Sequence, residues 1–118
     1  MPQDFKELKV WQRSRELNKE IYLLTKYFPE EEKFGMISQM RRASSSICAN
    51  IAEGAGKKTP KDFASFLYIA LGSTKEIESF LIMAKDVGHI TDAQFDSVVN
   101  VVSEVGKMLN GLIKRLGV

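Results

Sequence analysis

The stretch from Gln39 to Gly54 constrains the fold most, because it suits a helix throughout and is unusually rich in small side chains. It reads QMRRASSSICANIAEG, and the absence of proline, and of glycine before Gly54, predicts one helix that Gly54 and Gly56 close. At about 100° per residue, one face carries Ile37, Met40, Ser44, Ile47, Cys48 and Ile51. The opposite polar stripe is Gln39, Arg42, Ser46, Asn50 and Glu53. Two interpretations stay open: a helix with a solvated back, or a helix packed on several sides with the stripe at a contact between subunits.

Three further stretches repeat apolar residues at three- and four-residue steps, which is typical of amphipathic helices. The spacing of Asp4 and Glu7 predicts a capping box that opens the first of them, and Pro29 with the acidic triplet after it ends that helix. The second helix is expected to begin near Lys33 or Phe34. Thr59 and Pro60 predict the start of a third helix that ends at Gly88, and Thr91 with Gln94 predicts the capping box of the last.

The predicted apolar face of the third helix is Phe63, Leu67, Ala70, Thr74, Ile77, Leu81 and Ala84. The face of the last helix is Phe95, Val98, Val102, Val105, Leu109, Leu112 and Leu116. Short connections and no alternating pattern predict an all-α chain, an up-down-up-down antiparallel four-helix bundle, with residues 1–118 as a single domain. The apolar arcs of the first and third helices are wide, because they include Tyr22, Tyr68, Phe66 and Phe80. Either another subunit or a broad core covers these four side chains.

The net charge of +2 does not by itself indicate a nucleic-acid partner, but the basic residues are unevenly distributed. Between positions 41 and 61 only Glu53 is acidic, whereas the basic residues are Arg41, Arg42, Lys57, Lys58 and Lys61. Lys9, Arg13, Lys114 and Arg115 extend this group if the helix ends align. Such a patch is either a binding surface or ordinary solvated surface.

Catalytic groups are sparse, so an enzyme is the least favoured class. The single histidine, His89, is expected to be a solvated loop residue, and the single cysteine, Cys48, a small buried thiol. No metal site and no cofactor are expected, since neither paired Glu-x-x-His motifs nor a glycine-rich phosphate loop is present. No apolar run approaches the roughly 20 residues of a membrane span, and no signal peptide is visible, so we expect a cytoplasmic protein.

The run RASSSICANIAEG, from Arg42 to Gly54, resembles the signature of a bacterial family, the four-helix-bundle 23S rRNA intervening-sequence proteins, also described as ribosomal protein-like. Three further segments match in the same order, so that the resemblance covers nearly the whole chain: Leu8–Tyr22, Phe28–Met40 and Phe66–Glu78. The positions that match the motif are Arg42, Ser46, Asn50, Glu53, Gly54 and the pair Gly72-Ser73. The chain departs from it at Cys48, where a proline or another small residue is common, and at Ala55-Gly56-Lys57, where an aromatic residue precedes Gly-Arg.

The resemblance implies no active site and no cofactor. A divergent branch of the family serves as the accessory protein of diversity-generating retroelements, where it forms a barrel-shaped homopentamer that associates with nucleic acid and a reverse transcriptase. We therefore expect a non-enzymatic homo-oligomer, a pentamer in preference to a dimer, that binds RNA or DNA without sequence preference through clustered lysine and arginine. The alternative is a protein–protein adaptor for a nucleic-acid enzyme such as a reverse transcriptase.

Overall fold

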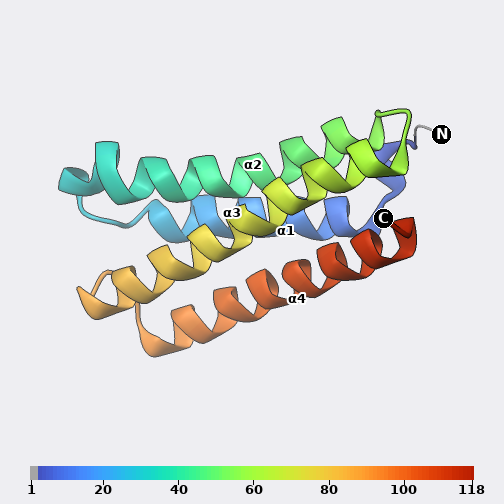
Figure 1. The fold of residues 1–118 in the computed structure, drawn as a ribbon. Coiled ribbons are helices and arrows are strands. Elements are labelled where there is room, and N and C mark those ends of the chain that lie inside the picture. The colour runs from blue at the N-terminus through green and yellow to red at the C-terminus, as the bar shows by residue number, and fades with distance from the viewer. Residues whose placement is uncertain (1–2) are drawn as a thin grey trace.

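The computed structural model describes residues 3–118, and its long elements are four helices joined by short connections (Figure 1). The helices are α1 (Lys9–Thr25), α2 (Ser38–Ala55), α3 (Pro60–Asp86) and α4 (Asp92–Leu116). Each helix runs opposite to the one before it, so the predicted all-α, up-down-up-down antiparallel bundle is confirmed. Residues 3–118 contain no strand, and none of their helices is long and apolar enough to cross a membrane.

The bundle is elongated, measuring 45 × 23 × 20 Å, and its two ends carry different connections. The α1–α2 and α3–α4 connections lie at one end, while the α2–α3 connection lies at the other, together with the start of the described chain and the C-terminus (Figure 1). We call the first the loop end and the second the terminal end. Residues far apart in the sequence therefore meet at the terminal end.

The core follows the predicted helical periodicity closely. All seven residues expected on the apolar face of α3 are buried, and so are Val98, Val102, Val105, Leu109 and Leu112 of α4. In α1 the polar gap at Ser14 is buried with its hydroxyl donating to the Val10 carbonyl at 2.7 Å. An apolar helix face can contain such a serine because the hydrogen bond is satisfied within the helix.

Two predicted helix starts lie earlier than the observed ones. Asp4 accepts a hydrogen bond from the Lys6 amide at 3.0 Å, but it caps only the short 3₁₀ turn η1 (Phe5–Glu7). Leu8 is extended, so α1 begins after it. Likewise, the acidic triplet forms the 3₁₀ turn η2 (Glu30–Glu32), and the wide turn η3 (Lys33–Ile37), non-helical at Gly35, precedes α2.

The other helix boundaries agree with the sequence signals, apart from the role of Gly54. Thr59 accepts from the Asp62 amide, the Thr91–Gln94 capping box forms, and Gly88 takes the left-handed conformation after α3. Gly54 and Gly56 were expected to close α2, and Gly56 is indeed its C-cap, one residue after Ala55. The bare Cα of Gly54 lies against α3, because an added Cβ would be 2.9 Å from Phe63 Cδ1 and from Phe66 Cβ.

Candidate nucleic-acid interface

The basic residues predicted as one patch lie in two separate places. Arg41 and Arg42 are near the start of α2, at the loop end, whereas Lys57, Lys58 and Lys61 surround the α2–α3 connection at the terminal end. A helix rises about 1.5 Å per residue, which separates Arg41 from Lys57 by roughly 24 Å along α2. The structure does not bring the two groups together.

Arg41 is engaged within the bundle. Its Nε donates to Thr25 Oγ1 at 2.9 Å, its Nη2 donates to the Tyr22 carbonyl at 3.3 Å, and its guanidinium lies 4.5 Å from the centre of the Tyr22 ring. A cation at the C-terminus of α1 also complements the partial negative charge of the helix end. The fully buried Thr25 was missed in the sequence, although it lies four residues after Ile21, to whose carbonyl it donates. Arg41 therefore ties α2 to α1.

The terminal end gathers basic side chains from three chain segments. The Gln3 amide donates to the Ala55 carbonyl at 2.8 Å, which holds the start of the chain against the end of α2. Lys57, from the α2–α3 connection, and Arg115, from the last turn of α4, line one hollow of about 360 Å³. Arg115 also lines a second hollow, of about 480 Å³, with Lys9 and Lys107. The start of α1 and the end of α4 thus lie at the same end of the bundle. This alignment is the condition under which Lys9, Lys114 and Arg115 extend the basic patch.

Arg13 does not extend this surface, because it is neutralised by carboxylates. Its Nε donates to Glu104 Oε1 of α4 at 2.9 Å and its Nη1 to Glu16 Oε2 at 3.0 Å. The hydrogen bond to Glu104 is the main reason why the pKa of Arg13 is raised. The Arg13–Glu104 ion pair joins α1 to α4.

A group of acidic residues lies at the opposite, loop end of the molecule. They include the η2 triplet and residues around the α3–α4 connection: Glu30, Glu31, Glu32, Asp86, Asp92 and Asp96. Five basic residues lie at the same end, namely Lys26, Lys33, Arg41, Arg42 and Lys85, and Lys85 forms an ion pair with Asp92 at 3.7 Å. Acidic and basic residues are thus nearly balanced at the loop end. At the terminal end the basic residues outnumber the acidic residues Asp4, Glu7, Glu53 and Asp62.

Much of the small-residue signature of α2 serves helix packing. Asn18 of α1 accepts hydrogen bonds from Ser44 and Ser45 at 2.7 and 3.1 Å, and Ser73 of α3 donates to Ser46 at 3.3 Å. Asn50 donates to the Ser46 carbonyl and hydroxyl at 2.8 and 3.0 Å. The three consecutive serines therefore face α1 on one side and α3 on the other.

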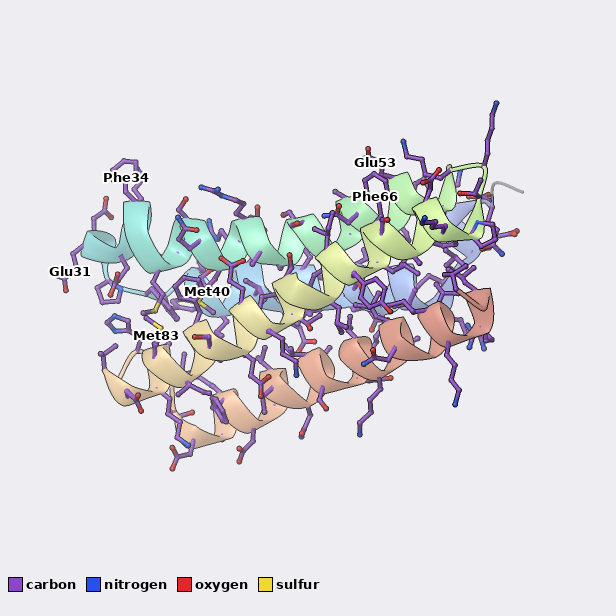
Figure 2. All side chains as sticks on the ribbon, viewed as in Figure 1. Glu31, Phe34, Met40, Glu53, Phe66 and Met83 are labelled. Atoms are coloured by element: carbon purple, nitrogen blue, oxygen red, sulfur yellow. The ribbon has the colours of Figure 1, made fainter. Side chains whose placement is uncertain are left out.

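Two members of the polar stripe, Arg42 and Glu53, are exposed. Glu53 forms no ion pair with any residue in the described range 3–118, and Figure 2 shows it on the outer side of α2. Asn50 and Glu53 are the stripe residues expected to contact a neighbouring helix end or another subunit. Of the described residues, the Asn50 side chain bonds only Ser46, within α2, and the Glu53 side chain bonds none. For both residues, contact with another subunit stays a prediction.

The two candidate reactive side chains have structural surroundings. Burial raises the pKa of the half-buried Cys48 thiol to about 11. The expectation that His89 is solvated is wrong: its side chain is 14% exposed, its Nε2 is 2.8 Å from Glu32 Oε2, and its ring lies 5.2 Å from that of Phe28. The α3–α4 connection packs on the η2 turn, which covers the imidazole. Within the described part of the chain, no three His, Cys, Asp or Glu side chains are grouped to hold a metal ion.

Comparison with known proteins agrees with this architecture. A crystal structure described as a protein with unknown function from the S23 ribosomal protein family of Bacteroides thetaiotaomicron superposes with a TM-score of 0.80. It is 32% identical, and the match covers 89% of this chain and 98% of that one. No curated protein matches. The family model for the 23S rRNA-intervening sequence protein matches residues 6–111, and the chain belongs to that family.

Proposed function

We propose that this protein is a non-enzymatic, homo-oligomeric helical scaffold that binds RNA or DNA through the basic side chains of its terminal end. The observation that carries the proposal is the convergence of the α2–α3 connection and the end of α4, where Lys57 and Arg115 line one hollow. Lys58, Lys61, Lys114 and Lys9 belong to the same end of the bundle. The family membership agrees with this function but does not assign it.

Phosphate contacts are the expected mode of binding. Flexible lysines attract the sugar–phosphate backbone without reading base sequence, and a few such contacts give only weak affinity at physiological salt. An oligomer repeats the terminal end about its symmetry axis, so one long nucleic acid contacts several copies at once and binds more tightly. Oligomerisation and nucleic-acid binding are therefore linked in this proposal.

The salt dependence of binding tests the proposal. We expect the protein to bind structured RNA or duplex DNA with micromolar or lower Kd at about 50 mM salt, with a steep decline of log K against log salt concentration. Replacing Lys57, Lys58, Lys61 and Lys114 together with Gln should flatten the slope by about 0.9 for each duplex phosphate that is no longer neutralised. The matched control replaces Lys19, Lys26, Lys33 and Lys75 with Gln, which changes the net charge equally away from the terminal end. An equally reduced affinity in both variants would contradict a localised interface.

A protein–protein adaptor for a nucleic-acid enzyme, such as a reverse transcriptase, is the second candidate. It is favoured by exposed aromatic side chains at the loop end, where Phe34 is 88% and Tyr27 83% exposed. Figure 2 shows Phe34 projecting away from the bundle. If the intact oligomer binds no nucleic acid at about 50 mM salt, the adaptor becomes the better explanation.

A further inference from the structure

The hollow shared by Lys57 and Arg115 differs in charge from its neighbours. Neither of these cations is accompanied by a carboxylate among the residues that line it. Four other surface hollows each include at least one carboxylate: Glu78, Glu20, Glu7 with Glu104, and Glu16, respectively. This hollow is therefore the one best suited to an anionic group.

Its remaining wall is largely apolar. Pro60 and Phe63 contribute from the first turn of α3, and Leu112 and Leu116 from the end of α4. An inorganic anion gains nothing from such a wall, whereas a ligand with an anionic group and a flat apolar part contacts both. The volume of about 360 Å³ is within the range of small-molecule sites.

Both cations are available to a ligand. Arg115 makes no hydrogen bond or ion pair with any residue of the described chain, so its guanidinium retains all of its donors. The ammonium of Lys57 lies 5.2 Å from the centre of the Phe66 ring. An exposed cation–π contact of this kind contributes only about 0.5–1 kcal/mol, so the flexible lysine can exchange it for a phosphate.

We propose that this hollow binds a phosphorylated nucleotide, with the phosphate held by Arg115 and Lys57 and the base or sugar against Phe63, Leu112 and Leu116. This inference rests on the proposed nucleic-acid binding and deepens it. It adds a nucleotide pocket to a surface that otherwise contacts the sugar–phosphate backbone. Apolar contact with a base face does not distinguish one base from another, so the site is compatible with binding that has little sequence preference.

Calorimetric titration of the full-length oligomer with AMP, adenosine and inorganic phosphate tests the proposal. AMP should bind at least about tenfold more tightly than either part alone, and Arg115→Gln or Lys57→Gln should weaken AMP binding roughly tenfold, as expected for one charged hydrogen bond. Lys75→Gln is the control and should leave AMP affinity unchanged. Photocrosslinking with 8-azido-AMP should label peptides that contain Phe63 or Leu112.

Two oligonucleotides distinguish the source of the nucleotide. If a 5′-phosphorylated tetranucleotide binds more tightly than both AMP and its own 5′-hydroxyl counterpart, the ligand is a strand end. If this tetranucleotide binds no more tightly than AMP, the ligand is a free nucleotide. Either result supports the site.

Any of four outcomes overturns the proposed site. The first is a phosphate affinity equal to that of AMP, which defines a simple anion site, and the second is crosslinking at the Lys9 and Lys107 hollow instead. In the third, AMP does not bind the native oligomer but binds after Tyr68→Asp dissociates it, which shows that a neighbouring copy fills the hollow. In the fourth, long RNA still binds with the steep salt slope while AMP does not bind, which removes this inference and leaves the proposed function standing.

Discussion

At the scale of single residues, Gly54 shows how a missing side chain sets the distance between two helices. A Cβ at this position would lie 2.9 Å from Phe63 Cδ1 and 3.2 Å from the Phe63 carbonyl oxygen. Because backbone atoms cannot give way as a flexible side chain does, Gly54→Ala should destabilise the protein by about 1–3 kcal/mol through overpacking. Urea denaturation measures the change in the free energy of unfolding.

Gly72 provides the matched control on α3. It is exposed, and nothing lies within 4 Å of the Cβ that alanine would add. Gly72→Ala should therefore stabilise the protein by about 0.5–1 kcal/mol, since alanine loses less backbone entropy in a helix. Equal effects of the two substitutions would show that α2 and α3 do not approach closely at Gly54.

The Cys48 thiol should be unreactive until strongly alkaline pH. Burial raises its pKa from the ordinary 9.0 to about 11, so at pH 9 the native protein holds far less thiolate than the unfolded chain. Because the thiolate is the nucleophile, alkylation by iodoacetamide at pH 9 should be at least about tenfold slower in native than in urea-unfolded protein.

The same shift has a consequence for stability. A pKa raised on folding contributes stability below the unfolded value of 9.0, and this contribution is lost as pH rises to about 11. Cys48→Ala should lack this component of the alkaline decline. Since the chain contains one cysteine, the mass of the alkylated protein reports this site alone, and equal native and unfolded rates would contradict its burial.

At the scale of elements, the loop end is held together by a contact between two connections. His89, after α3, hydrogen-bonds Glu32 of η2 and packs on Phe28. Removing the imidazole in His89→Ala leaves a partly buried carboxylate without this partner and should cost about 1–2 kcal/mol. Thermal or urea unfolding gives the value.

Glu31→Ala is the control for this contact. Glu31 is the exposed neighbour of Glu32 in the same turn and makes no hydrogen bond or ion pair with a described residue, so its replacement should change stability by less than about 0.5 kcal/mol. A comparable destabilisation in both variants would mean that the net charge of the turn, rather than the His89 hydrogen bond, determines stability.

At the scale of the whole molecule, apolar side chains remain on the surface of the bundle. Of the four aromatic residues that widen the predicted arcs, Tyr22 and Tyr68 are exposed and Phe66 and Phe80 are half-buried. Ile69 and Met83 of α3, and Val87 directly after it, are exposed as well. We expect a second copy to cover part of this surface, and a head-to-tail contact that closes gives a ring. The number five derives from the family resemblance alone.

Light scattering at micromolar concentration measures this oligomer. A particle of five times the chain mass of 13.3 kDa is expected, and Tyr68→Asp should reduce its mass because it places a charge in the apolar surface. A dimer would retain the interface and exclude the pentamer, and a particle of 13.3 kDa would exclude both.

The number of helices, their direction and most of their buried faces were predictable from the sequence, because helical periodicity and end caps depend on residues a few positions apart. Thr59, Thr91 and the apolar row from Phe63 to Ala84 illustrate this. The resemblance of Arg42–Gly54 to its family signature was also visible there.

The tertiary structure decided the features that join distant segments. The basic residues between Arg41 and Lys61 form two groups, because α2 runs from one end of the bundle to the other. Lys57 lies instead beside Arg115, which is far from it in the sequence. Three other contacts likewise depend on packing between helices or connections. They are the hydrogen bond from Arg41 to Thr25, the burial of His89 against Glu32, and the close approach of Gly54 to α3. Local sequence rules carry no information on such contacts, since the partners come together only when the bundle closes.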